Sequence, residues 1–190
     1  MSDYKGFWDW FSFNQKEIFL NIEKDIDHWV PLISQKLSEI DENIAFEISE
    51  RLEDDIRQFI ISADGIFDSF QIVVDLYNSK PELEFWQFIP FRQRENMITH
   101  SVNIDGILLA YENIKFTYEV IDSMVYLDIY IQGYTVDDNR YVHAYFLLLD
   151  SLIGEFDAVT MIENTNVHPF EESEDLLDFY SLKAIIDDLK

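Results

Sequence analysis

Apolar and polar residues alternate with a two-residue period at two places that also carry turn signals, and each place predicts a β-hairpin. The first hairpin is expected from residues 44–49 and 56–63. The second is expected from residues 114–120 and 125–131, where the clean alternation indicates that one sheet face meets water or a partner. Residues 155–162 alternate as well and predict the last strand.

The most apolar short run of the chain is residues 85–91, which Arg92 and Arg94 follow. At a two-residue period, Trp86 and Phe88 point to one side and further apolar residues to the other. A strand that is apolar on both sides needs cover on both sides, so we expect it inside the sheet.

Apolar residues three and four apart, together with capping residues, predict five helices. The aromatic-rich residues 4–13 are expected to pack the first helix onto the domain, and residues 95–106 are expected to be irregular up to a turn at Asp105 and Gly106. The first helix is expected to begin at Asn14, with Glu17 completing a capping box, and the second to span residues 27–38, with Asp27 as cap. The third is expected over residues 67–79, and the fourth from Asp137 or Asp138 to Leu152, with Gly154 at its end. The fifth is expected to run from Leu176 to the C-terminus.

This order of elements predicts the α+β class. We expect a single mostly antiparallel sheet of about six to seven strands, with helices largely on one face and two helices ahead of it. The order strand-strand-helix-strand occurs twice, which allows two such units and some parallel neighbours. We expect one domain over residues 1–190, with the helical residues 1–40 packed on an α+β core of residues 41–190.

The charge of the chain restricts its partners. Thirty-eight acids oppose 13 bases, which gives a formal net charge of -25. This charge repels nucleic acid and anionic membranes, because phosphate binding needs clustered Lys and Arg, and it attracts basic partners or divalent cations. The simpler alternative is that the acids keep an aromatic-rich domain soluble.

Several classes of protein are disfavoured by what the sequence lacks. It contains no cysteine, no apolar run close to a membrane span, and no basic start typical of a signal peptide. We therefore expect a cytoplasmic protein, a monomer or weak dimer. With five glycines and no familiar catalytic motif, we expect no cofactor and no metal site, and a non-enzymatic role is favoured. The four histidines are scattered: His28, His100, His143 and His168.

Arg92 and Arg94 are the basis of an alternative, enzymatic interpretation. On a continuing strand these side chains would project to the same side and could clamp a carboxylate or a phosphate. The simpler explanation is that they neutralise nearby acids.

The outer face of the second predicted hairpin is the candidate partner-binding surface. Tyrosines give amphipathic contact area, and acids around them would steer a basic protein. Ordinary cross-strand packing on a solvated face is the alternative. The candidate residues are Tyr126, Asp128, Tyr130, Tyr134, Asp137 and Asp138.

Four strings resemble those of small bacterial hypothetical proteins of unknown function: residues 46–49 (FEIS), 61–65 (ISADG), 86–94 (WQFIPFRQR) and 149–155 (LDSLIGE). The resemblance covers most of the chain, from Phe7 to the final helix. It implies a bacterial, single-domain, soluble protein, and it brings no site residues with it.

Charge, missing catalytic motifs and the tyrosine-rich face together favour an acidic binding protein. An immunity or antitoxin-like protein that neutralises a basic toxin or effector fits this description best. The alternatives are an enzyme with an anion-binding pocket near Arg92 and Arg94, and a regulatory protein-interaction module.

Overall fold

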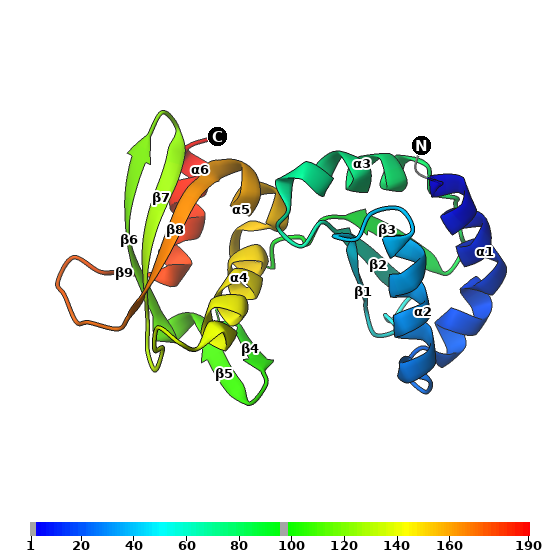
Figure 1. Ribbon diagram of the computed structural model, residues 1–190, viewed down its shortest axis with the longest axis horizontal. Helices are drawn as coiled ribbons and strands as arrows, with labels where there is room; N and C mark the ends of the chain where they lie inside the picture. The colour runs from blue at the N-terminus through cyan, green and yellow to red at the C-terminus, as the bar shows by residue number, and fades with distance from the viewer. Residues whose placement is uncertain (1–2, 96–98) are drawn as a thin grey trace. The chain divides into compact units, whose positions relative to one another are not determined.

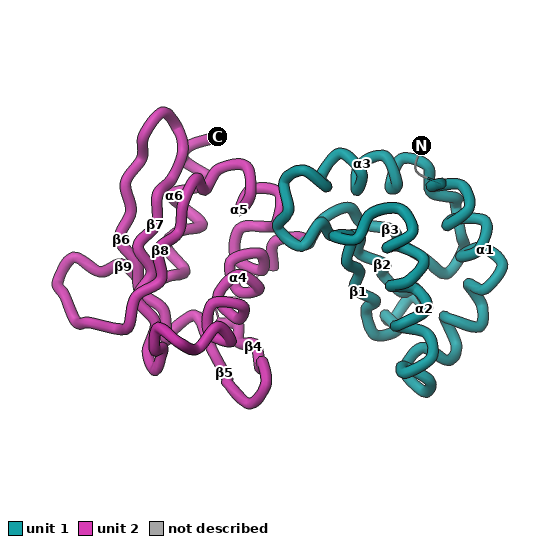
Figure 2. The backbone as a smooth tube through the Cα atoms, viewed as in Figure 1, with its two compact units in different colours: residues 1–92 teal, residues 93–190 magenta. Residues whose placement is uncertain are grey.

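A computed structural model describes residues 3–95 and 99–190, which form two compact units. Unit 1 contains residues 1–92 and unit 2 contains residues 93–190 (Figure 2). The described residues form six α-helices and nine strands, which confirms the α+β class and the two N-terminal helices. The expectation of a single sheet is wrong, because the strands form three small sheets. The expectation of one domain stays a prediction.

Unit 1 is a three-stranded sheet with three helices (Figure 1). The sheet order is β1-β2-β3, in which β1 and β2 are antiparallel and β2 and β3 are parallel. The predicted first hairpin is thus confirmed. The bounds are α1 Tyr4–Asn21, α2 Ile26–Ser38, β1 Ala45–Ile48, β2 Arg57–Ser62, α3 Phe70–Asn78 after a single 3-10 turn at Phe67–Ser69, and β3 Trp86–Pro90.

Aromatic side chains build the core of unit 1. Phe11 of α1 lies 5.1 Å from Phe59 and from Trp86 between ring centroids, and 5.6 Å from Phe88. The indole of Trp8 donates a hydrogen bond of 2.8 Å to the carbonyl of Leu76 in α3. Because these contacts involve one face of the sheet, the aromatic N-terminal residues do pack the first helix onto the rest of the unit.

The first helix begins earlier than the capping-box pattern suggests. Asp3 caps α1 and accepts a hydrogen bond from the amide of Gly6. Asn14 lies inside the helix, where its side chain donates to the carbonyl of Trp10. The buried residues Phe7 and Phe11 are four positions apart, so they form an apolar stripe of a helix that begins before Asn14. The predicted helix start at Asn14 is therefore wrong.

Strand β3 lies at the edge of its sheet, so the prediction of an internal strand is wrong. Only one of its faces is buried: Trp86 and Phe88 face the core, and Gln87 is exposed. The strand ends at Pro90, and Phe91 has a φ of 61°, which side chains of its size rarely adopt. Phe91 therefore leaves the strand alternation and packs against Phe70 of α3, 4.6 Å away between ring centroids.

Unit 2 contains a four-stranded sheet of order β8-β7-β6-β9 and a separate β4-β5 hairpin (Figure 1). The predicted hairpin of β6 and β7 is confirmed, as is the helix after it, which Asp138 caps and Gly154 ends. The bounds are β4 Ser101–Ile104, β5 Ile107–Ala110, β6 Ile114–Ile121, β7 Met124–Ile131, α4 Asn139–Ile153, α5 Glu155–Met161, β8 Ile162–Pro169, β9 Leu177–Asp178 and α6 Leu182–Asp188.

The predicted strand over residues 155–162 is wrong, because residues 155–161 form helix α5. Its first turn closes when the amide of Ala158 donates to the carbonyl of Gly154. A short run of apolar residues fits either period, so its pattern alone does not separate helix from strand. The next strand, β8, extends through His168 to Pro169. Strand β4 lies where we expected irregular chain, and α6 begins at Leu182, after the short β9.

Both units repeat one connectivity, strand-strand-helix-strand. In each, an antiparallel hairpin is followed by a helical crossover and a third strand parallel to the second, as β1-β2-α3-β3 and as β6-β7-α4-α5-β8. In unit 2, residues of α4 and α6 form one core with the inward residues of β6 and β7. The helices thus cover one face of this sheet and leave the other for the outward residues.

Candidate functional site

The outward residues of β6, β7 and β8 form a continuous polar and aromatic surface, which we call the open face. Strand β7 places Tyr126, Asp128 and Tyr130 here, because the residues between them are buried in the core. The strand register sets three rows across the sheet. The rows are Lys115, Tyr130 and His168; Thr117, Asp128 and Asn166; and Glu119, Tyr126 and Asn164.

Asp128 is the centre of a hydrogen-bonded group on the open face. Its Oδ1 lies 2.8 Å from Nε2 of His168 and accepts a hydrogen bond of 3.2 Å from the side-chain amide of Asn166. The ring of Tyr130 stacks on His168 with centroids 5.1 Å apart. The side chains of His168 and Asp128 are 42% and 46% exposed, so the group offers hydrogen bonds and aromatic area to a partner.

The structure brings together three of the six predicted partner-binding residues and separates the others. Tyr134 is only 9% exposed and packs in the core beside Tyr141, with centroids 6.1 Å apart. Asp138 caps α4 and bonds Arg140, which lowers the pKa of its carboxyl. Asp137 is exposed in the turn before α4.

A tight turn explains why Tyr134 leaves the expected surface. Gly133 has a φ of 83°, a left-handed conformation that suits glycine, and the amide of Tyr134 donates to the carbonyl of Ile131. The turn breaks the alternation of β7, and the tyrosine ring enters the core.

Arg92 and Arg94 contact separate sets of carboxylates, each within its own unit. Arg92 donates to Glu47 at 2.6 Å and to Asp64 at 3.0 Å. Because the strand ends at Pro90 and Phe91 has a positive φ, the two arginines do not continue a strand. Both guanidinium groups are already engaged by acids of the chain.

Arg94 ties together the helical end of unit 2. It donates to the carbonyl of Ile153 at 2.6 Å, to Asp157 at 2.7 Å and also to Asp187. Burial opposes its charge, but the two carboxylates outweigh this and raise the pKa of Arg94. The same contact lowers the pKa of Asp187.

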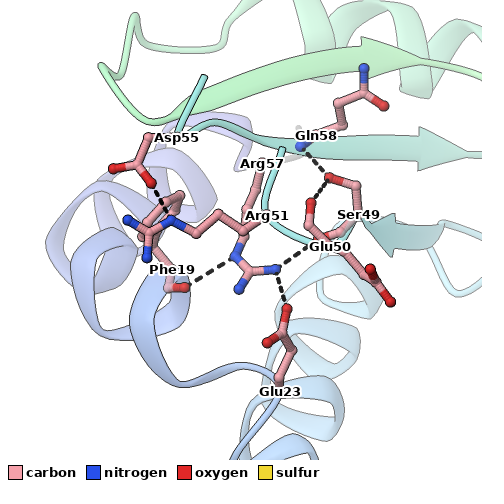
Figure 3. Close-up of polar contacts among 8 residues, drawn as sticks. All are labelled: Phe19, Glu23, Ser49, Glu50, Arg51, Asp55, Arg57 and Gln58. Carbon is pink, nitrogen blue, oxygen red and sulfur yellow. Dashed lines mark hydrogen bonds and ion pairs between the residues drawn. The ribbon is translucent and has the colours of Figure 1, made fainter. Parts of the chain in front are cut away.

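Arg57 is a buried cation that the sequence interpretation missed. Its side chain is 4% exposed, and it donates to the carbonyl of Phe19 at 3.0 Å and to Glu23 and the carbonyl of Ser49 at 2.8 Å each (Figure 3). These bonds join the end of α1 to the β1-β2 hairpin. Arg57 shares its strand face with the buried Phe59, and a charge in a buried row is a signal that the sequence does contain.

Neither a metal centre nor a membrane span is found in the described part of the chain. Residues 3–95 and 99–190 hold no group of three or more His, Cys, Asp or Glu side chains placed to bind a metal ion. No helix within these ranges is long and apolar enough to cross a membrane.

Comparisons of the chain with protein-family models, with curated proteins and with solved structures find no match. The resemblance to small bacterial proteins therefore stays a prediction.

Proposed function

We propose that this chain is an acidic binding protein whose open face docks on a basic protein, in the manner of an immunity or antitoxin-like protein that neutralises a basic toxin or effector. The proposal is carried by one observation: Tyr126, Asp128 and Tyr130 lie together on a sheet face opposite the helices of unit 2. The setting would be the bacterial cytoplasm.

Charge supports a basic partner. Residues 93–190 contain 19 acids and five bases, so the open face lies in the more acidic unit. A field of this sign accelerates encounter with a positively charged protein and repels nucleic acid. Exposed acids in the loop after β8 add to it, namely Glu171, Glu172, Glu174 and Asp175.

The aromatic residues supply what charge alone does not. Tyrosine buries a large amphipathic surface at a low cost in side-chain entropy, and interfaces are enriched in it. Tyr130 is held by stacking on His168, which Asp128 orients, so its ring is preorganised for contact. Preorganisation of this kind lowers the ordering cost of association.

The test is capture of a partner followed by measurement with purified proteins. The immobilised chain is exposed to extract of its own host at low salt, and recovered basic proteins are then titrated individually. We expect one basic protein whose association rate falls steeply as salt rises to about 0.15 M, where the screening length is about 8 Å. Recovery of no basic protein, or binding that salt leaves unchanged, would contradict the proposal.

Two alternatives are weaker. An anion pocket at Arg92 and Arg94 would need both guanidinium groups to give up carboxylates that they already bind, Glu47 and Asp64 for Arg92 and Asp157 and Asp187 for Arg94. A regulatory interaction module would use the same open face, and the identity of the captured protein separates it from an immunity protein.

A further inference from the structure

Unit 2 contains a cavity of about 380 Å³ whose walls are aromatic and whose charged lining residues are acidic. We call it the Tyr111 pocket. Its aromatic walls are His100, Tyr111, Phe179 and Tyr180, and its acids are Glu112 and Asp178. Neither lysine nor arginine is among its described lining residues.

Tyr111 is the fixed element of this pocket. The residue is 5% exposed, and its ring packs edge-on against Phe179 with centroids 5.5 Å apart. Its hydroxyl makes no hydrogen bond to any residue that the structure describes, although it belongs to a buried side chain that lines the pocket. The hydroxyl oxygen is not one of the buried polar atoms that lack a partner, so it is open to solvent and available to a ligand.

The acids around the pocket are only partly compensated. Glu112 is exposed, and Asp178 bonds Lys115 of β6. Nδ1 of the lining residue His100 lies 3.2 Å from the carboxylate of Glu95. Burial, and then the charge of Glu95, raise the pKa of Tyr111, so its hydroxyl stays neutral and presents an oxygen that can accept hydrogen bonds.

The pocket adjoins the open face. Asp178 of β9 pairs in register with Lys115 of β6, which stands in the same row as Tyr130 and His168. A partner that covers this end of the open face would therefore reach the pocket as well.

We propose that the Tyr111 pocket binds the guanidinium side chain of an arginine presented by the basic partner. A planar, weakly hydrated guanidinium stacks on aromatic rings and gains from nearby carboxylates, and a single neutral oxygen accepts one of its N–H groups. Arginine is also enriched among the residues that contribute most to protein interfaces. The identification of the occupant rests on the proposed function.

The test uses capped arginine, N-acetyl-arginine methylamide, as the probe and the full chain as the receptor. Backbone amide shifts of His100, Tyr111 and Tyr180 are followed by NMR during titration. We expect saturable shifts confined to the pocket, with binding in the range of about 1 mM, and at least tenfold weaker binding of the neutral isostere capped citrulline. Equal binding of citrulline, or shifts spread evenly over the acidic loops, would overturn the proposal.

Matched variants separate the pocket from general charge. Glu112→Gln should weaken capped arginine at least threefold, and Tyr111→Phe should weaken it while keeping the ring. Glu171→Gln removes an equal charge from the exposed loop after β8 and should leave binding within twofold. If Glu171→Gln weakens binding as much as Glu112→Gln does, the pocket is not the site.

Failure of this proposal can be told apart from failure of the proposed function. If a basic protein is captured and its footprint omits the pocket residues, the arginine site is overturned and the binding function stands. If capped arginine binds the pocket and no basic protein is captured, the site stands and the proposed function fails.

Discussion

Units 1 and 2 share one strand connectivity and differ in what they carry on the sheet face opposite their core. In unit 1 this face presents Gln58 bonded to Gln87, and Glu47, whose charge Arg92 neutralises. In unit 2 it presents two tyrosines and Asp128, a carboxylate held by His168 and Asn166. The same topology thus produces a neutralised amide surface in one unit and an acidic aromatic surface in the other.

The units also use their scarce cations differently. Unit 1 buries Arg57 to join its first helix to its hairpin, whereas unit 2 places Arg94 between α5 and α6. With 19 acids in each unit, but eight bases in residues 1–92 and five in residues 93–190, more acids in unit 2 remain for contact with a partner. Connectivity positions the faces, and residue type decides their chemistry.

The largest effects should come from the two hydrophobic cores. Trp86→Ala in unit 1 and Phe116→Ala in unit 2 should each lower the free energy of unfolding by about 3–5 kcal/mol, because both side chains are buried. Hydrogen exchange should show that each variant loses protection mainly in its own unit.

Trp86→Phe is the control for this pair. It keeps the aromatic bulk and removes an indole N–H that is buried and has no hydrogen-bond partner in the described part of the chain, so it should cost less than about 1.5 kcal/mol. A loss below about 1 kcal/mol for Trp86→Ala would show that the edge strand is not part of the core.

Arg57→Met should give the next largest effect, a loss of about 2–4 kcal/mol in unit 1. The carbonyls of Phe19 and Ser49 would each lose a charged donor in a buried setting. Chemical denaturation measures the loss. Arg51, whose partner Asp55 is exposed, provides the comparison: Arg51→Met should leave the free energy of unfolding almost unchanged. Equal losses for the two variants would contradict the joining role of Arg57.

A smaller effect should appear in the pH dependence of unit 2. The Arg94 guanidinium holds the pKa of Asp187 below its usual value, so the contact contributes stability above the usual carboxyl pKa and loses it as the pH falls through the lowered pKa. Between about pH 5 and pH 3, Asp187→Asn should therefore flatten the loss of stability seen in the native chain. Asp188→Asn, a change at the exposed neighbouring residue, should leave the dependence of stability on pH unchanged. If Asp187→Asn shows the same dependence on pH as the native chain, the linkage is contradicted.

Local pattern was sufficient for the elements whose signals agree with one another. The β6-β7 hairpin combines clean alternation with a turn at Asp122 and Ser123, both of which have a positive φ, and α4 has both a cap and a terminal glycine. The division into three sheets could not be predicted, because strand pairing is a long-range property that local periodicity does not specify. The prediction for residues 155–161 failed for a local reason, because so short a run fits both the helical and the strand period.

The candidate site was predicted in part for the same reasons. Alternation along β7 correctly placed Tyr126, Asp128 and Tyr130 on one face. His168 and Asn166 could not be assigned to that face before the parallel pairing of β8 with β7 was known. Tyr134 lies in the core because of the turn at Gly133, which the alternation of β7 did not predict. The Tyr111 pocket is formed by segments that are almost seventy residues apart in sequence, so local pattern could not predict it.

The most direct test compares the open face of unit 2 with the corresponding sheet face of unit 1, by the affinity of each variant for the captured basic protein. Calorimetric titration would use Tyr126→Ala/Tyr130→Ala in unit 2 and Gln58→Ala/Gln87→Ala in unit 1, each checked for unchanged folding. We expect the tyrosine variant to bind at least about thirtyfold more weakly, which corresponds to the loss of a contact worth about 2 kcal/mol. The glutamine variant should stay within about threefold of the native chain. Equal affinity of the two variants, or a larger loss in unit 1, would contradict the assignment of binding to the open face of unit 2.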